Sequence, residues 1–430
     1  YTDYQWDQFR QDDGHIYWMN VFEHAYGEDK TTTQNGEAFW IQARVLEWAK
    51  YPKIETLDDY FKVLEEYNAA NPTTHDGKKN VPYTMLCEDW RYFCLENAPE
   101  FLDGYPNDGS VIVDTNTKKI VDYNTTATAK RYFKKLNEEY QKGVIDTGAF
   151  TQTYDEYITK LSTGVVLGMC DQWWDFAYTV NDVFKTQGTE QYGYNYIPLG
   201  LTIDKGMENQ WYTSGGTLNV SSGIAITTSC KDVEGAFKFI DDLLSQEIHD
   251  LRFWGVKDVD YKVDDNGLYY RTEEMRSNAA DPNYKAKHLC TYSYFPQWLG
   301  TSRDGKNAMM PSEQVSEFQD SLPEPVKKVF DAYGAKTYID IIGSVNKAGP
   351  WFPMYSYSNN MKTDTAGGTA WTKMGECKHA WLPKVVMAKD FEKTWEEYMN
   401  AYAACKPEDF VAEMQQELDK RIAAYEAATK

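Results

Sequence analysis

The sequence predicts an α/β fold that is divided into more than one domain, and three observations support this. The chain has 430 residues, and because single cores seldom serve much more than ~150 residues, two or three domains are expected. Helix-like and strand-like segments alternate along the chain, which is typical of βαβ units with parallel sheets. Hydrophobic residues make up 42% of the chain, so a packed core is expected and disorder is expected only near the ends.

Most of the expected helices are marked by apolar residues at helical spacing. Residues 36–51 carry such a pattern, and a second helix is expected to begin after Thr56 and to close at Pro72. Further helices are expected over 126–143, 153–164 and 233–251, and the last segment predicts two helices divided at Lys406-Pro407.

Short apolar runs and turn-rich stretches complete the predicted order of elements. Buried strands are expected at 81–86, 165–170 and 222–229. Turn-rich stretches lie at 103–110, 204–222, 300–312 and 359–370. The last of these holds Ala366-Gly367-Gly368-Thr369, which predicts a mobile loop.

The composition is rich in aromatic residues and acidic. Aromatic residues make up 15%, with 33 Tyr and 14 Trp, and buried Tyr and Trp need polar partners. The surplus indicates either a binding surface or a general preference for Tyr, and both interpretations stay open at this point. A net charge of −22 repels phosphate backbones and anionic lipids, so binding of nucleic acid is disfavoured.

Cysteine usage and the chain ends limit the setting. The seven cysteines form no CxxC motif and no cluster with zinc spacing, so a structural disulfide framework is not expected, and cysteine usage alone indicates a reducing or anaerobic setting. No apolar run approaches 18 residues and no signal peptide is present. The chain opens at Tyr1 within an amphipathic pattern, so a mature or trimmed piece is expected.

Enzymatic motifs are not found in the sequence. There is no GxSxG, HExxH, GxxxxGKS or GxGxxG, and no motif singles out a pair of carboxylates for glycoside hydrolysis. No catalytic residue and no metal ligand are therefore nominated. An acidic cluster lacks the spacing of an EF-hand loop, so a solvated turn is expected there, with calcium as the minor alternative; its members are Asp258, Asp260, Asp264, Asp265 and Asn266.

Several blocks are similar in order and spacing to one protein family. They are VLEWAKYPKIETLDDYFKVL, QKGVIDTGAFTQTYDEYITKLSTG, STGVVLGMCDQWWDFAY, SSGIAITTSCKDVEGAFKFIDDLLS, WGVKDVDYKVDDNGLYY and TWEEYMNAYAACKPEDFVAEMQQELDKR. Over residues from about 36 to the end, the chain resembles the extracellular solute-binding proteins of carbohydrate ABC importers, the bacterial sugar-binding lipoproteins. It departs from them in lacking the opening strand and helix of the first lobe, and in carrying Asp258 where Gly is common. Asp tolerates a left-handed backbone, so the turn is expected to survive.

The resemblance implies a two-lobed periplasmic-binding-protein-like fold, with a mainly parallel sheet and flanking helices in each lobe and a hinge between them. Lobe I is expected to comprise 1–82 and 200–290, with a truncated front, and lobe II 83–199 and 291–430. The implied function is capture of a neutral oligosaccharide outside the cell and delivery to an ABC permease by hinge closure, without catalysis or cofactor. A lipid anchor on a Gram-positive cell surface is also implied. A glycoside hydrolase and a surface glycan-adhesion module are the alternatives.

The expected ligand site lies beyond the carboxyl ends of the strands, where ligands collect in open α/β sheets. Asp171, Trp173 and Trp174 follow the strand at 165–170, and Glu88 and Trp90 follow the strand at 81–86. Indole rings stack on the C–H face of a sugar while carboxylates accept from its hydroxyls. One of the paired Trp residues is expected in the core and the other at the cleft; for Trp90, packing under a helix is the equal alternative.

Other candidates come from aromatic loops and from the resemblance. Trp351 and Tyr355 lie in a Pro-rich aromatic loop at 349–357 that is expected to meet the ligand or to pack on its own lobe. Trp211 is expected in the hinge or in the cleft wall. Relatives carry a charged pair near the positions of Trp40 and Gln42. Because this chain lacks that pair, the resemblance carries the ligand contacts of these two residues over only in part. Trp254 is expected to be structural, because it precedes a tight turn.

Overall fold

The computed structural model describes residues 2–11, 13–25, 29–106, 111–214, 220, 223–290, 292 and 294–430. The described strands are β1 (Phe22–Ala25), β2 (Glu37–Gln42), β3 (Val81–Tyr83), β4 (Ile112–Asp114), β5 (Lys119–Val121), β6 (Val166–Gln172), β7 (Tyr196–Leu199), β8 (Thr213–Ser214), β9 (Lys262–Val263), β10 (Tyr269–Tyr270), β11 (Gln297–Gly300) and β12 (Asn346–Lys347).

The α-helices are α1 (Asp3–Phe9), α2 (Ala43–Trp48), α3 (Leu57–Ala70), α4 (Phe93–Glu96), α5 (Ala98–Leu102), α6 (Ala127–Gln141), α7 (Tyr154–Ser162), α8 (Trp173–Gln187), α9 (Val233–Leu243), α10 (Gln246–Phe253), α11 (Glu273–Ala280), α12 (Pro282–His288), α13 (Val315–Ser321), α14 (Glu324–Tyr333), α15 (Tyr338–Ile342), α16 (Tyr355–Ser358), α17 (Ala366–Met387), α18 (Phe391–Ala403) and α19 (Pro407–Thr429). Short 3-10 helices are η1 (Asp89–Tyr92), η2 (Tyr123–Thr125), η3 (Thr189–Tyr192) and η4 (Pro311–Glu313).

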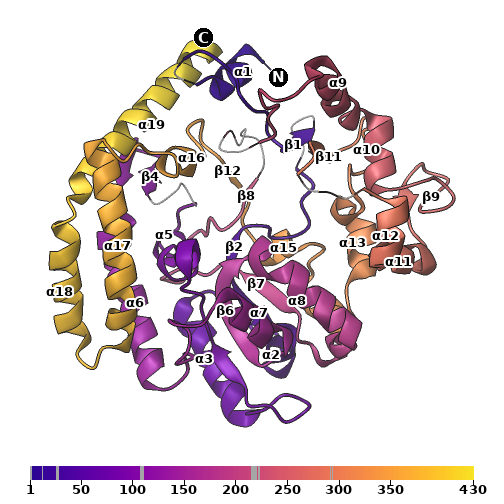
Figure 1. Cartoon of the computed structure of the whole chain (residues 1–430). Coiled ribbons are helices and arrows are strands. Elements are labelled where there is room, and N and C mark those ends of the chain that lie inside the picture. Colours follow the sequence, from indigo (N-terminus) through magenta and orange to yellow (C-terminus); the bar gives the residue numbers. More distant parts are fainter. Residues whose placement is uncertain are drawn as a thin grey trace.

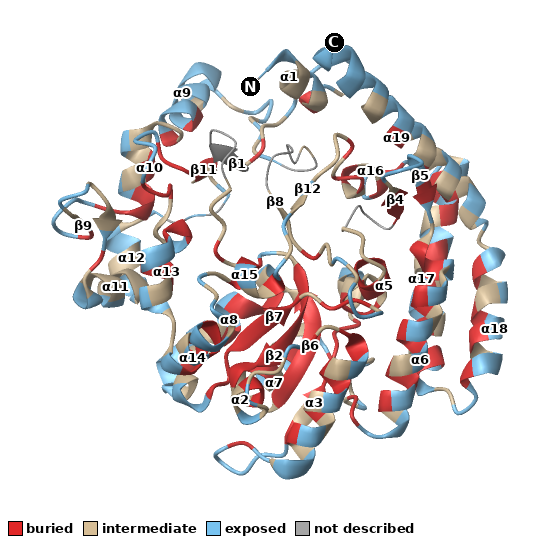
Figure 2. Ribbon diagram, turned by 180° about the vertical axis from the view of Figure 1, so that it is seen from behind, coloured by how far each residue is buried: buried red, intermediate tan, exposed pale blue. Residues whose placement is uncertain are grey.

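A four-stranded sheet in the order β3-β6-β2-β7 forms the centre of one lobe. β3 pairs with β6 in parallel, whereas β2 runs antiparallel to both of its neighbours. All six residues of β2 are buried, and Figure 2 shows the sheet as a buried layer surrounded by α2, α3, α7 and α8. We call this the sheet lobe; it spans residues 37–199 and 324–429 and includes the C-terminal helices α17, α18 and α19, which stand on one side of it (Figure 1).

The opposite side of the molecule holds smaller elements (Figure 1). A parallel pair, β1 with β11, and an antiparallel pair, β9 with β10, lie there with α9, α10, α11 and α12. We call residues 22–25 and 233–300 the second lobe. Its buried centre is formed by Trp254, which donates its indole N–H to the Ala308 carbonyl at 3.1 Å, and by Tyr261 with its ring centroid 5.7 Å from that of Trp254.

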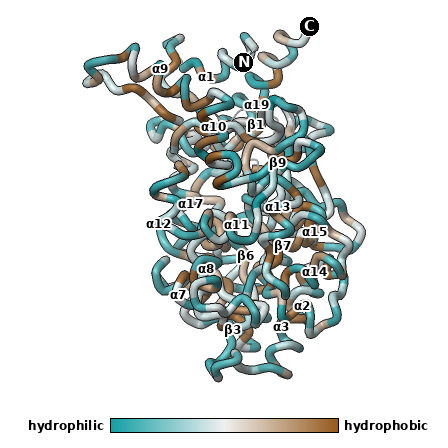
Figure 3. The backbone as a smooth tube through the Cα atoms, turned by 90° about the vertical axis from the view of Figure 1, so that its right-hand side faces the viewer, coloured by the Kyte–Doolittle hydropathy of each residue, from teal (hydrophilic) through white to brown (hydrophobic). Residues whose placement is uncertain are grey.

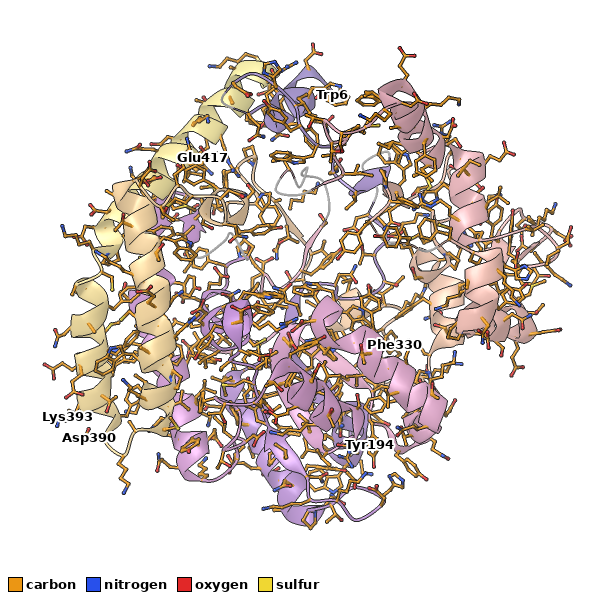
Figure 4. The ribbon with its side chains drawn as sticks, in the orientation of Figure 1. Trp6, Tyr194, Phe330, Asp390, Lys393 and Glu417 are labelled. Atoms are coloured by element: carbon orange, nitrogen blue, oxygen red, sulfur yellow. The ribbon has the colours of Figure 1, made fainter. Side chains whose placement is uncertain are left out.

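Two of the segments that join the lobes, which contain Gln34 and Trp211, lie side by side and contact the sheet lobe at Tyr338 and β12. β8 pairs with β12 in parallel, the Tyr338 amide donates to the Thr32 carbonyl, and the Gln34 side-chain amide donates to the Trp211 carbonyl at 2.9 Å. The chain therefore crosses between the lobes more than once. The two described ends also meet, because Tyr4 of α1 packs against Tyr425 of α19 with centroids 5.9 Å apart; Figure 4 labels Trp6 on α1 and Glu417 on α19.

The structure confirms a mixed α/β fold and the helices predicted over 126–143, 153–164 and after Thr56, whose hydroxyl accepts from the Asp59 amide. The strand predicted at 165–170 is β6 and that at 81–86 is the shorter β3. The last two helices divide at Lys406-Pro407 as predicted. Asp258 has a φ of 67°, so the left-handed turn predicted there is present.

Four local predictions were wrong. Residues 37–42 form a strand and not the start of a helix, because pairing on both sides of a fully buried run outweighs helical spacing. The helix at 233–251 is two helices, divided where the Ser245 hydroxyl caps α10. The loop predicted at 366–369 is the first turn of α17, capped by Thr365. Within 223–229, the described part of the strand predicted at 222–229, the structure has only a bridge from Ile224 to Met19.

The sheets also differ in detail from the predicted architecture. The main sheet is mixed and not mainly parallel, since β2 runs against its neighbours. β2 was assigned to lobe I, yet it pairs with β6 and β7, which were assigned to lobe II, so strands from both predicted segments share one sheet. The remaining boundaries of the lobes stay a prediction.

Candidate functional site

The candidate site lies at one edge of the main sheet, where two parallel strands end together. β3 and β6 are in register with Val81 opposite Val166 and Tyr83 opposite Gly168, so their carboxyl ends meet at the same edge. The segment leading to η1 follows β3, and α8 begins directly after β6. This topology brings together residues 88–90 and 171–174, which are far apart in the sequence.

Two exposed indole rings are stacked at this edge. Trp90 of η1 and Trp174 of α8 have ring centroids 5.7 Å apart and planes inclined by 13°. Their exposed fractions are 53% and 43%, respectively, which is unusual for so large an apolar side chain. We call this pair the indole platform. Phe93 lies beside it, with its centroid about equally far from both rings, 5.9 Å from Trp90 and 6.0 Å from Trp174.

Polar groups hold the indole platform in place. The Arg91 guanidinium lies 4.4 Å from the centroid of the Trp90 ring and 4.0 Å from that of the Tyr154 ring, and its Nε donates to Asp175 at 2.9 Å. The Tyr154 hydroxyl donates to the Asp175 carbonyl at 2.6 Å. On α8, the Trp174 Nε1 donates to Gln172 Oε1 at 2.6 Å. The platform is therefore fixed from the side of the protein before any ligand arrives.

Glu88 is turned toward this framework. Its carboxylate accepts from the Tyr154 amide at 2.6 Å, so one oxygen is committed to the start of α7. Tyr178 follows Trp174 by one turn of α8 and is exposed. The surface next to the indole platform therefore offers a carboxylate and a phenol, which are groups that pair with hydroxyl-bearing ligands.

A buried polar layer supports the platform from below. Asp171 has no exposed surface and accepts from the Tyr157 hydroxyl at 2.7 Å and from the Cys94 thiol at 3.3 Å. Burial, followed by the nearby charge of Asp175, raises the pKa of Asp171 to about 7. Burial likewise raises the pKa of Glu37 to about 8, although Asn97 donates to this carboxyl at 3.2 Å. These carboxyls belong to the interior of the sheet lobe.

Five of the predicted ligand contacts are buried in the structure: Trp211 and Trp351 keep 4% and 5% of exposed surface and the other three keep none. These residues face the interior of the protein outside the second lobe: Asp171, Trp40, Gln42, Trp211 and Trp351. Each has polar partners inside the protein, except that the Trp351 ring instead packs under the Lys118 ammonium at 4.5 Å.

The partners explain why these side chains face inward. The Trp40 indole donates to the Asp171 carbonyl at 2.8 Å and the Trp211 indole to the Leu201 carbonyl at 2.7 Å. Trp211 also stacks on Phe101, with centroids 4.1 Å apart. Gln42 donates to the Gly164 carbonyl at 3.1 Å. These hydrogen bonds inside the protein satisfy the buried indole and amide groups.

Trp173 and Trp174 divide as the sequence predicted for such a pair. Trp173 packs on buried Trp40 and on Tyr338, with centroids 5.5 Å and 5.9 Å apart, while Trp174 is exposed. Tyr355 is half-buried at the start of α16, where its ring lies 6.1 Å from that of Phe352. Trp254 is structural, as predicted, since it is fully buried. The role of the exposed residues toward a ligand stays a prediction.

Metal-ligating groups gather at one place in the described part of the chain. Ligand atoms of Cys94, Asp171 and Asp175 lie within 4.8 Å of one another. The Arg91 guanidinium is ion-paired with Asp175 at 2.9 Å, so its positive charge repels a metal cation at this place. In the acidic turn, Asp264 accepts from the Asn266 and Leu268 amides at 2.8 Å each, and Asp260 accepts from the Tyr284 hydroxyl. The carboxylates of Asp175, Asp264 and Asp260 thus accept hydrogen bonds from the protein itself, and binding of a metal at the acidic turn stays a prediction.

Arg91 and Tyr154 are framework residues that sequence reasoning missed. Arg91 directly follows Trp90, and Tyr154 directly follows the cap of a predicted helix. An Arg beside an exposed Trp is a recurring cation–π arrangement, and this was the one available signal.

Comparison with known proteins addresses the fold. No family model matches the chain. A stretch of 158 residues, 34% of this chain and 27% of the relative, is 28% identical to the curated "Fructooligosaccharide ABC transporter substrate-binding protein FusA" of Streptococcus pneumoniae. The chain thus matches only about a quarter of that relative's length.

Solved structures match over nearly the whole chain. An "HMO binding ABC-transporter associated Solute Binding Protein" from Bifidobacterium longum infantis superimposes with a TM-score of 0.60 at 15% identity, covering 96% of this chain and 79% of that one. FusA of S. pneumoniae in complex with fructo-nystose gives a TM-score of 0.57 at 16% identity, covering 97% and 78%. The chain has the fold of ABC-transporter solute-binding proteins.

This solute-binding-protein fold confirms the fold class predicted from the sequence. In it, the indole platform lies beyond the carboxyl ends of β3 and β6, at the edge where β2 begins and β7 ends. Among the described residues, none of the helices combines the length and low polarity needed to span a lipid bilayer.

Proposed function

We propose that the protein captures a neutral oligosaccharide outside the cell and delivers it to the permease of an ABC importer. The observation that carries this proposal is the indole platform, Trp90 stacked on Trp174 at the strand-end edge of a solute-binding-protein fold. The relatives named above are described as binding oligosaccharides, which supports the same ligand class.

The chemistry of the platform suits a sugar. A pyranose ring has an apolar face of C–H groups that packs against indole, while its hydroxyls need donors and acceptors at the rim. Glu88, Gln172 and Tyr178 supply such groups next to the rings. Arg91, the cation beside the Trp90 ring, is already paired with Asp175, which disfavours an anionic sugar, and the net charge of −22 acts in the same direction.

Capture proceeds by closure of the two lobes about the connecting segments. A ligand that contacts both lobes in the closed form shifts the population toward that form, and the closed form is then recognised by the permease. No bond is made or broken, so the protein is not an enzyme and needs no cofactor. A lipid anchor on a Gram-positive cell surface completes the proposal.

Two other functions predict different measurements. A glycoside hydrolase would release products from a panel of glycans, whereas a binding protein would bind them saturably without turnover. A rigid adhesion module would keep its radius of gyration on adding ligand, whereas lobe closure would lower it in small-angle scattering.

Calorimetry with neutral oligosaccharides of increasing length tests the proposal. The wild-type protein is expected to bind at least one series with about micromolar affinity. Trp174→Ala and Trp90→Ala are each expected to weaken binding at least tenfold, because each removes a stacking surface. Trp48→Ala is the matched control, since Trp48 is 39% exposed but packs edge-on against Tyr67, away from the platform.

The control variant is expected to bind like the wild type. Equal loss of affinity in all three variants would indicate a general loss of structure, and unchanged affinity in the two platform variants would reject this site. No heat with any neutral oligosaccharide would reject the ligand class.

A further inference from the structure

Two half-buried cysteines meet where the C-terminal helices pack together. Cys377 lies in α17, and Cys405 lies two residues after the end of α18, the helix that packs against α17. Both side chains pack against the main core of the sheet lobe, and both are free thiols in the structure. The helix pair is seen along one side of the molecule in Figure 1.

The contacts of Cys405 place its sulfur atom against the turn of α17 that precedes Cys377. The Cys405 thiol lies 3.4 Å from the Lys373 carbonyl and 3.5 Å from the Ala401 carbonyl. Cys377 lies one turn after Lys373, and side chains of a helix lean toward its N-terminus, so the Cys377 thiol leans toward the same carbonyl. Consistent with this, burial together with the neighbouring Cys405 thiol raises the pKa of Cys377 to about 12.

We propose that Cys377 and Cys405 form a disulfide bond when the protein is in an oxidising medium. The bond would join the middle of α17 to the turn between α18 and α19, and it would close a loop that contains the whole of α18. α18 begins at the opposite end of this layer, where Asp390 caps the helix through the Lys393 amide (Figure 4). The bond would thereby link the C-terminal end of α18 covalently to α17, at the turn that leads into α19.

The chemistry is an ordinary thiol–disulfide exchange with a small-molecule disulfide as oxidant. The Cys405 thiolate attacks one sulfur of the oxidant, which leaves one small thiol and a mixed disulfide on Cys405. Cys377 then loses its proton and attacks the Cys405 sulfur, which releases the second small thiol. The protein loses two hydrogens and the oxidant is reduced to two thiols, so atoms and electrons balance.

The remaining cysteines make useful comparisons. Cys87, Cys94 and Cys170 are buried, and Cys94 and Cys170 donate to the carboxyls of Asp171 and Glu37. Cys290 is exposed and belongs to the second lobe, apart from Cys377 and Cys405, so it is accessible to the same oxidant. Oxidation of Cys290 therefore reports on reactivity alone, without ring closure.

Peptide mapping after exposure to oxidised glutathione tests the proposal. The protein is treated with the oxidant, alkylated and digested with trypsin without reduction. Cleavage after Lys373, Lys378, Lys393 and Lys420 yields peptides 374–378 and 394–420, the latter intact at Lys406-Pro407. We expect these two peptides to appear joined and two hydrogens lighter than their sum, while Cys290 appears alkylated or glutathionylated.

Thermal unfolding gives an independent readout. Oxidised wild-type protein is expected to melt about 3 °C above reduced protein, since the bond restricts the unfolded chain. Cys377→Ser and Cys405→Ser should each remove this difference, and Cys290→Ser should keep it. Recovery of both peptides separately, with each cysteine alkylated or bound only to glutathione, would overturn the proposal. The wild-type map alone decides the matter if a serine variant does not fold.

Discussion

The two lobes use similar elements but bury them to very different degrees. The main hydrophobic cluster of the protein is formed by residues between Ala38 and Trp211 and between Phe318 and Leu418, all outside the second lobe. This cluster includes residues from all four strands of the main sheet. The second lobe buries only small groups, such as Trp254 with Phe253 and Tyr261.

The helices of the second lobe show the consequence. α9 is strongly amphipathic in sequence, yet Val233, Phe237 and Phe239 on it are exposed, and only Ile240 and Leu243 are buried. Figure 3 shows α9 projecting at the edge of the molecule with hydrophobic positions along it. A pair of strands offers too little apolar surface to bury one face of a helix. A sheet of four strands offers enough surface to bury helices that pack on its faces.

Truncating one central tryptophan in each lobe should give the largest contrast. Trp40→Ala is expected to lower the free energy of unfolding of the sheet lobe by about 4 kcal/mol, because it empties a fully buried position next to Trp173 and Phe176. Trp254→Ala, its counterpart in the second lobe, should shift only the transition of that lobe. Urea unfolding followed by circular dichroism and by tryptophan fluorescence measures both.

A single shared transition in both variants would break the comparison, since it would mean that the lobes unfold as one unit.

The buried carboxyls of the sheet lobe predict a pH effect of intermediate size. The folded pKa of Glu37 is raised to about 8, above its value in an unfolded chain, so the folded state holds its proton over a pH range in which the unfolded state has lost it. Stability should therefore fall as the pH rises from about 4 to about 8. Glu37→Gln is expected to remove part of this fall and to add about 2 kcal/mol at pH 8.

Asp171 keeps the remaining slope in that variant, because burial raises its pKa to about 7 as well. Chemical unfolding of both proteins at pH 5 and pH 8 provides the measurement, because this range lies between the unfolded and folded pKa values of Glu37. Equal pH dependence in the wild type and the variant would show that Glu37 is not the group that binds the proton.

The fold was predictable in outline from local patterns. Caps and terminators such as Thr56, Gly143 and Pro407 act within a few residues, so the helices beginning or ending there were found. β2 was missed because it is specified by the two strands that pair with it, and residues far along the chain supply them. Gly367 and Gly368 predicted a loop, but they lie in the first turn of α17, where Thr365 accepts from the Gly368 amide and Glu413 of α19 accepts from the Gly367 amide. Glu413 also packs where a Cβ of Gly367 would lie, which leaves room only for glycine.

The candidate site was predictable as a location and not residue by residue. The rule that ligands gather beyond strand ends selected residues 88–90 and 171–174, and the structure brings these together. It could not tell that Asp171 points inward while Trp174 is exposed, because Asp171 belongs to β6 and Trp174 to α8, and the rule does not fix where the strand passes into the helix. Nor could this rule tell that the rings of Trp211 and Trp351 are buried in the core.

A smaller effect is expected at the turn of the second lobe that departs from the family pattern. Asp258 holds a φ of 67°, and its amide donates to the Tyr261 carbonyl at 2.7 Å. Asp258→Ala should lower stability by about 1 kcal/mol, because alanine tolerates this conformation poorly, whereas Asp258→Gly should leave it within about 0.5 kcal/mol of the wild type. Thermal melts of the two variants compare them, and equal melting points would exclude backbone strain as the constraint.

The smallest effect is expected on the exposed face of α9. Phe237 is 56% exposed, so Phe237→Ser should change the free energy of unfolding by less than about 0.5 kcal/mol. Leu243→Ser, on the buried face of the same helix, should cost several times more, because it buries a hydroxyl and leaves a cavity. If the two variants lose equal stability in urea unfolding, the outer face of α9 is covered in solution, and the second lobe is then packed as well as the sheet lobe.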